Sequence, residues 1–138
     1  MIFLIACSKK DNSSTDPNNF WTCHHETTWD SLATQNTLIG EWNWEYLTCP
    51  RFSENPNNEE FNGLSIEFKA DLTLDVKQNG AFVSSSNWQV VEREEDLFGL
   101  VVDPPVDQLN GRIFFCKEEV EFSNSYVDGC DHFFERKD

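Results

Sequence analysis

The residues of this chain best suited to chemistry are its cysteines and histidines. Five cysteines occur in 138 residues, and four of them lie in the body of the chain: Cys23, Cys49, Cys116 and Cys130. In an exported protein this even number predicts two disulfides, with three possible connectivities. The alternative is a metal site, because histidines stand close to two of these cysteines: His24, His25 and His132. No Cys-x-x-Cys pair occurs, and structural zinc sites usually contain such tight pairs, so the spacing favours disulfides.

The fifth cysteine, Cys7, ends an apolar run. Residues 1–6 read Met-Ile-Phe-Leu-Ile-Ala, and Ser8, Lys9 and Lys10 follow directly. A run ending in Leu-x-Ala-Cys resembles the lipobox of a lipoprotein, in which the cysteine is acylated and becomes the mature N-terminus. A complete secretory signal has an apolar region of about 7–15 residues, so we interpret residues 1–7 as a truncated lipoprotein signal. Six apolar residues cannot span a bilayer, which takes about 20, so the expected anchor is lipid attached at Cys7.

Residues 8–22 are predicted to be a flexible tether, because most of them are polar and Pro17 interrupts them. The Lys9-Lys10-Asp11 sequence is similar to the signal that sends some bacteroidete-type lipoproteins to the cell surface. A solvated tether explains the same residues equally well. We therefore expect an outer-membrane lipoprotein on the periplasmic face or the cell surface, with its folded domain at residues 23–138.

Composition narrows the choice of partner and activity. The formal net charge is −15, whereas binding to nucleic acid requires a basic face, so nucleic acid is not an expected partner. The 12 Phe and five Trp indicate a packed core rather than a disordered chain. The sequence contains no nucleophile elbow, phosphate loop or His-Glu-x-x-His motif, so we expect no enzymatic activity and no cofactor. Calcium binding in the acidic segments 54–62 or 92–96 is a weaker idea, because the spacing of a known calcium loop is absent.

Hydrophobic alternation predicts an all-β domain after a short helix over residues 30–38, with Asp30 or Ser31 as its cap. In the first expected strand Trp42, Trp44 and Tyr46 share one face. Asn79-Gly80 predicts a tight hairpin turn, because both central residues of a type I′ turn need positive φ. About eight short antiparallel strands are expected, at 40–47, 64–69, 72–77, 82–92, 97–102, 112–116, 120–122 and 131–136. Strands at this spacing favour a barrel or a sandwich.

Several short motifs make the chain resemble a lipocalin. Gly40 and Trp42 match the Gly-x-Trp at the start of the first lipocalin strand, after a short helix. Residues 68–72, Asn79-Gly80 and residues 87–90 resemble the small lipocalin-like domains of bacteroidete-type lipoproteins. The resemblance covers about residues 30–136 and implies an eight-stranded up-and-down barrel. It also implies that an arginine near the end of the last strand packs over the motif tryptophan.

The resemblance has consequences for the seam and for the cysteines. In the implied barrel the last strand closes on the first, so Gly40, Trp42 and Arg136 form the structural seam. The same closure implies disulfides Cys49–Cys130 and Cys23–Cys116, with a bulge or an irregular strand end needed to absorb an offset of one residue. The competing connectivity joins Cys116 to Cys130 and Cys23 to Cys49.

Lipocalins often hold a small apolar ligand, and the resemblance implies such a ligand in this barrel. A binding protein anchored in the membrane by acyl chains is therefore the expected function. The alternative is a non-catalytic surface interaction or structural module, because side chains alone can fill an eight-stranded barrel. The residues expected to line a cavity are Trp44, Tyr46, Leu64, Ile66, Phe68, Leu72, Leu74, Trp88 and Val90.

Overall fold

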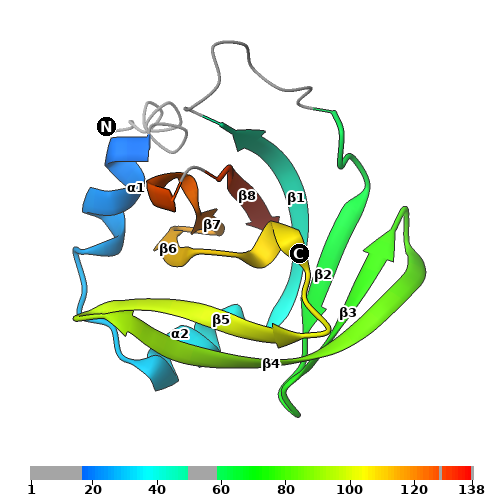
Figure 1. Cartoon of the computed structure of the whole chain (residues 1–138), viewed down its shortest axis with the longest axis horizontal. Helices are drawn as coiled ribbons and strands as arrows, with labels where there is room; N and C mark the ends of the chain where they lie inside the picture. Colours follow the sequence, from blue (N-terminus) through cyan, green and yellow to red (C-terminus); the bar gives the residue numbers. More distant parts are fainter. Residues whose placement is uncertain (1–16, 50–58, 128, 138) are drawn as a thin grey trace, which may run out of the picture.

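The computed structural model describes residues 17–49, 59–127 and 129–137, and these contain a closed barrel of eight antiparallel strands. Each strand pairs with the next along the chain, and the last pairs with the first (Figure 1). The all-β fold predicted from the period-two pattern and the eight-stranded barrel implied by the resemblance are both confirmed. The strands are β1 (Gly40–Thr48), β2 (Leu64–Phe68), β3 (Thr73–Gln78), β4 (Ala81–Glu94), β5 (Leu97–Asp103), β6 (Arg112–Cys116), β7 (Glu119–Ser123) and β8 (Asp131–Arg136).

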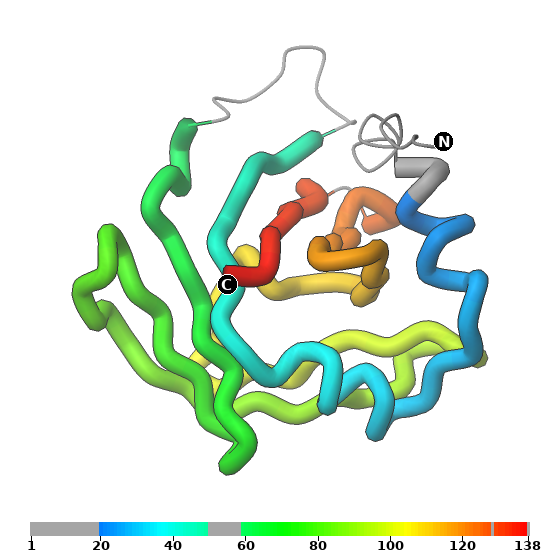
Figure 2. Tube along the Cα trace, turned by 180° about the vertical axis from the view of Figure 1, so that it is seen from behind, coloured from blue at the N-terminus to red at the C-terminus, as the bar shows by residue number. Residues whose placement is uncertain are grey.

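Two α-helices precede the barrel, α1 (Pro17–His24) and α2 (Ser31–Leu38). The second is the helix expected from the sequence, and Asp30 caps it by accepting the Ala33 N–H at 2.8 Å. Figure 2 shows α2 running across the end of the barrel where β1 begins, and it packs against β4. Short 3-10 helices follow β5 and β7, at η2 (Asp107–Leu109) and η3 (Ser125–Val127).

The predicted tether is wrong at its C-terminal end, because residues 17–22 belong to α1. Phe20 of this helix is fully buried and packs edge-on against Phe133, with ring centroids 5.3 Å apart. These contacts come from residues far away in the sequence, which the polar composition of the segment does not reveal. The remaining tether residues and Cys7 lie outside the described part of the chain.

A β-bulge in β1 changes which side chains face the interior. The register of β1 against β8 shifts between Trp44 and Tyr46. A bulge adds one residue to one strand, so the alternation of faces changes at that point. Tyr46 therefore lies outside the barrel, where its ring stacks on Phe133 at 4.4 Å, and Leu47 joins the interior core instead. The expectation that Tyr46 lines the interior is wrong for this reason.

The turns that shape the sheet agree with the sequence. Asn79 and Gly80 join β3 to β4 with φ of 54° and 84°, as the type I′ prediction requires. Gly40 begins β1 at φ 133°, and a Cβ there would lie 2.8 Å from Nη1 of Arg136. The glycine of the Gly-x-Trp motif thus allows the Arg136 side chain to cross the start of β1.

Two disulfides fasten the barrel, and both are the pairs implied by the resemblance. Thr48 pairs with Asp131 across the seam, which places Cys49 beside Cys130 with 4.3 Å between their Cα atoms. The other bond joins Cys23 of α1 to Cys116 at the end of β6. It holds α1 on the outer face of the barrel beside β6 (Figure 1). A disulfide-bonded cysteine is not available as a metal ligand, so the alternative metal site of cysteines and histidines is wrong.

Apolar side chains from every strand fill the barrel interior. Eight strands make a barrel just wide enough for side chains to pack its centre. The buried core draws on each strand in turn: Trp42, Ile66, Leu74, Trp88, Leu100, Ile113, Val120 and Phe134. A second, smaller core lies outside the sheet beneath α1 and contains Phe20, Phe114, Cys116 and Phe133.

Candidate functional site

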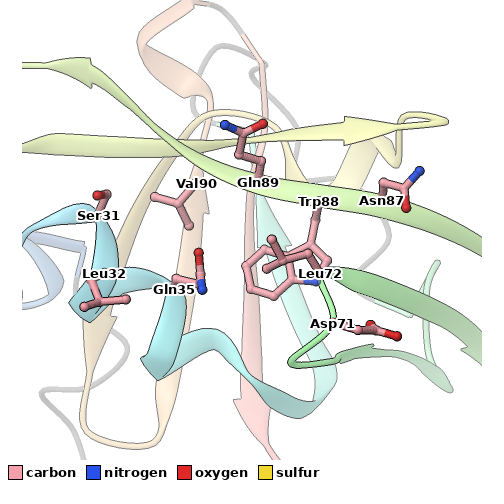
Figure 3. A pocket seen from close by; sticks show the side chains of 9 residues that line it. All are labelled: Ser31, Leu32, Gln35, Asp71, Leu72, Asn87, Trp88, Gln89 and Val90. Carbon is pink, nitrogen blue, oxygen red and sulfur yellow. The ribbon is translucent and has the colours of Figure 1, made fainter.

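A hollow of about 490 Å³ lies between α2, the turn that joins β2 to β3, and the middle of β4 (Figure 3). It is open to solvent on one side and lies at the wall of the barrel rather than in its centre. Its lining residues come from all three elements and are Ser31, Leu32, Gln35, Asp71, Leu72, Asn87, Trp88, Gln89 and Val90.

The hollow exists because β4 is longer than its neighbour β3. The first residue of β3, Thr73, pairs with Asn87, so β4 continues to Glu94 with β5 on one side and no β3 partner on the other. The helix α2 packs beside this part of β4 in place of a strand. A helix cannot follow the edge of a strand as closely as another strand does, and a gap remains between them.

Backbone geometry directs polar groups into this gap. The Trp88 N–H donates to the Leu72 carbonyl at 2.9 Å, so the backbone groups of Trp88 point towards the β3 side. Backbone groups alternate between the two edges of a strand, and β4 has no bulge between Trp88 and Val90. The N–H and carbonyl of Val90 therefore point into the hollow. They can bind a ligand or water through hydrogen bonds.

The hollow has an apolar base and a polar rim. Trp88 and Val90 are 2 % and 8 % exposed, and Leu72 closes over the indole, as Figure 3 shows. Trp88 is held in place because its Nε1–H donates to the Thr73 carbonyl at 2.9 Å. The exposed side of α2 contributes Leu32, which is 62 % exposed. The rim carries the side chains Ser31, Gln35, Asp71, Asn87 and Gln89.

One rim residue supplies a fixed negative charge. The Thr73 hydroxyl and N–H both donate to Oδ1 of Asp71, at 2.6 and 3.0 Å. These hydrogen bonds lower the pKa of Asp71 below its ordinary value, so the carboxylate stays ionised at neutral pH. The arrangement suits a molecule with a flat apolar face and a neutral or cationic polar edge.

The structure brings together only part of the expected ligand-binding set. Leu72, Trp88 and Val90 line the hollow. The sequence reasoning missed the contribution of α2, whose position beside β4 is a tertiary contact. The only available signal was the polar alternation of Asn87 and Gln89 with these apolar residues. The remaining members inside the barrel belong to the packed core: Trp44, Leu64, Ile66, Phe68 and Leu74.

Two of the three histidines are buried and structural. His132 accepts the Nε1–H of Trp44 at 3.0 Å, and His24 accepts the Phe115 N–H at 2.9 Å through Nδ1. Burial lowers the pKa of each to about 4, with the charge of His25 adding to the effect at His24. Among the described residues no group of three or more potential ligands is placed to hold a metal ion.

Carboxyl groups also cluster on the outer face of β1, β7 and β8. Glu45 lies near Glu119 and Glu135, and its Oε1 is buried with no hydrogen-bond partner among the described residues. Burial, together with the charges of Glu119 and Glu135, raises the pKa of Glu45 to about 8. The pKa of Glu119 is also raised, chiefly by burial. Both carboxyls are therefore easier to protonate than an exposed glutamate.

The comparisons with known proteins found no similar family, protein or structure: no family model matches the chain, and no curated protein or solved structure matches it. The helices in the described part of the chain are all too short or too polar to cross a membrane.

Proposed function

We propose that this chain is a non-catalytic, lipid-anchored, lipocalin-like binding protein, and that its ligand occupies the hollow between α2 and β4. The observation that supports this most directly is the hollow of about 490 Å³ with Trp88 and Val90 at its base. Small-molecule sites typically have volumes of about 300–1,000 Å³ and combine apolar walls with a few polar groups. The ligand class is a small amphipathic molecule with one flat apolar face.

The packing of the interior argues for the wall of the barrel over its centre. Ile66 and Leu74 are completely buried, and Phe68 is 1 % exposed, so the space expected for an apolar ligand is occupied by side chains. The same packing supports a second candidate function, a non-catalytic surface interaction module. The binding experiment below separates the two candidates.

The lipid anchor at Cys7 is part of the proposal and rests on the sequence alone. The apolar run before Cys7 and the polar residues after it support an outer-membrane lipoprotein. On this proposal the barrel stands at the periplasmic face or at the cell surface.

A substitution that fills the hollow tests the site. We expect the neutral fluorophore 1-aminoanthracene to bind the folded domain, with its emission shifted to shorter wavelength. Gln35→Phe places a ring in the hollow and should weaken binding about tenfold or more, which corresponds to about 1.4 kcal/mol. Asn36→Phe is the matched control, because Asn36 is exposed on the same helix and does not line the hollow.

The result also decides between the candidates. Equal binding by both variants would place the fluorophore elsewhere and refute the hollow as the site. No binding by the unsubstituted domain would favour the interaction module. Native mass spectrometry of protein purified from its own cells then identifies the mass of the natural ligand.

A further inference from the structure

A second hollow of about 320 Å³ lies on the outer face of the barrel, on the side that carries α1. Its floor is formed by β6, β7 and the start of β8, and its edges are formed by α1 and η3 (Figure 1 shows the arrangement of these elements). It does not share a residue with the hollow at α2. The lining residues are Trp21, Arg112, Phe114, Glu121, Ser123, Ser125, Tyr126 and Asp131.

Two aromatic rings stand exposed at the edges of this outer hollow. Trp21 and Tyr126 are 48 % and 46 % exposed, so each leaves apolar ring surface open to solvent. Both rings are held in position. Trp21 lies against His25 and Phe114, with centroid distances of 4.3 and 5.4 Å. The Arg112 guanidinium lies 3.8 Å from the centroid of the Tyr126 ring. Each ring is therefore a partly exposed apolar surface held in a fixed position, with the Arg112 guanidinium against one face of Tyr126.

The floor between the rings is polar and contains two buried carboxyl groups. Glu121 and Asp131 are only 4 % and 5 % exposed. Asp131 is fixed by three hydrogen bonds, from the backbone N–H groups of Asn124 and Ser125 and from the Ser125 hydroxyl. Glu121 is opposite Phe114 in β6 and Phe133 in β8, so apolar rings flank it on both sides.

Hydrogen-bonding groups remain available around this floor. The Nε of Arg112 is buried and has no hydrogen-bond partner among the residues that the structure describes. Its Nη2 donates to Glu94, outside the hollow. Ser123 adds a hydroxyl, which both donates and accepts. A ligand in this hollow meets donors and acceptors together, between two aromatic faces.

The residues that line the hollow include one cation and one ionised carboxylate, and the cation is also paired with Glu94 outside the hollow. Arg112 is positive and Asp131 is negative. Burial, reinforced by the charge of Asp131, raises the pKa of Glu121 to about 8, so this carboxyl is largely neutral at pH 7. Burial, with the charges of nearby glutamates that include Glu121, raises the pKa of the Tyr46 hydroxyl in β1, so this group stays neutral. A hollow with this balance disfavours ligands of high net charge.

We propose that the outer hollow binds a neutral polyhydroxylated molecule, with a monosaccharide ring as the unit that fits it. A sugar ring has apolar C–H faces, which match the rings of Trp21 and Tyr126. Its hydroxyl groups each donate and accept, which matches the mixed floor of Glu121, Ser123 and Arg112. This site is separate from the proposed ligand hollow at α2, and either can fail without the other.

Calorimetric titration of the folded domain tests this proposal. The probes are free glucose, galactose and N-acetylglucosamine at millimolar concentration, with choline chloride as a cationic probe. We expect at least one sugar to bind saturably at neutral pH. Trp21→Ala should weaken that binding about tenfold, and Trp21→Phe should weaken it less because a ring face remains. Phe82→Ala is the control, since Phe82 is a 63 % exposed ring outside the hollow.

The pH dependence gives an independent readout of Glu121. Sugar binding should weaken as pH rises through about 8, where the neutral carboxyl loses the proton that it donates. Glu121→Gln keeps a neutral donor of the same shape, so it should bind at neutral pH and show no such decline. Circular dichroism of each variant establishes that it is folded.

Three results would overturn the proposal. The first is the absence of saturable binding by any of the sugars. The second is sugar binding that Trp21→Ala leaves unchanged in a folded variant. The third is binding of choline alone with release of a proton, which would show that the carboxyl pair holds an organic cation instead.

Discussion

The Arg136 guanidinium lies over the Trp42 ring, 4.2 Å from the ring centroid, and joins the last strand of the barrel to the first. Trp42 and Arg136 are also register partners across the β1–β8 seam. The same guanidinium donates to the Thr37 and Ile39 carbonyls at 2.5 and 3.2 Å, where α2 passes into β1. The Arg136 side chain therefore connects the last strand, β8, with the first strand, β1, and with the C-terminal end of α2.

Replacing this arginine should destabilise the fold considerably. We expect Arg136→Met to lower the free energy of unfolding by about 2–4 kcal/mol, because it removes a cation–π contact and two charged hydrogen bonds. Urea denaturation measures the change. Lys137→Met is the matched control, since its exposed ion pair with Glu41 at 3.7 Å contributes at most about 1 kcal/mol. Equal effects of the two substitutions would refute a special role for Arg136.

Gly40 should tolerate a side chain poorly for two separate reasons. Its φ of 133° is unfavourable for other residues, and an added Cβ would meet Nη1 of Arg136 at 2.8 Å. We expect Gly40→Ala to cost about 2–3 kcal/mol in thermal or urea unfolding. Gly80→Ala separates the two causes, because Gly80 also has positive φ but has open space around its Cβ position. Its cost should be smaller, about 1 kcal/mol.

Peptide mapping under non-reducing conditions identifies the two disulfide pairs directly. We expect one linked peptide containing Cys49 and Cys130 and another containing Cys23 and Cys116. A peptide linking Cys116 to Cys130 would contradict the seam. The sequence separations are 81 and 93 residues, and loops of this size correspond to about 4–5 kcal/mol each in the chain-entropy model. Replacing either pair by serines should lower the melting temperature strongly.

Stability should have its maximum at mildly acidic pH. His24 and His132 have a pKa lowered from 6.5 to about 4, so the unfolded chain binds more protons as pH falls from 6.5 towards 4, and stability is lost over that range. Glu45 and Glu121 have a pKa raised from 4.5 to about 8, so their contribution is complete below 4.5 and is lost as pH rises towards 8. Together the two effects place the maximum of stability between about pH 4.5 and pH 6.5.

Melting temperatures recorded across this pH range measure both slopes. Glu121→Gln should flatten the alkaline side, because the amide does not ionise. Glu95→Gln is a suitable control, since Glu95 is exposed in the turn between β4 and β5. A melting temperature that rises steadily from acid to alkaline pH would contradict the prediction.

The lipid anchor requires a test in cells. We expect the protein, expressed from its gene with the upstream start, to fractionate with membranes, and Cys7→Ser to release it into the soluble fraction. Cys7 is the acceptor in the proposal because it follows the apolar run of residues 1–6. A Cys7→Ser protein that stays in the membrane fraction would disprove acylation at this residue.

Much of the barrel could be predicted from local sequence patterns. The period of two in β1 to β8, the cap at Asp30 and the turn at Asn79-Gly80 are short-range features, because each depends on residues a few positions apart. The Gly-x-Trp motif formed by Gly40 and Trp42 could be recognised for the same reason, because its residues are two positions apart. Local patterns predicted the fold class correctly, and the resemblance supplied the closure and the disulfide pairs.

Only the tertiary structure determined where the two hollows lie and which side chains line them. The bulge that turns Tyr46 outwards depends on the pairing of β1 with β8, and the helical state of residues 17–22 depends on Phe133 and Cys116. Both hollows bring together residues far apart in the chain, such as Gln35 with Val90. The pKa of Glu121 depends on burial beneath other strands. Short-range periodicity does not predict such contacts, because they arise only when distant segments pack against one another.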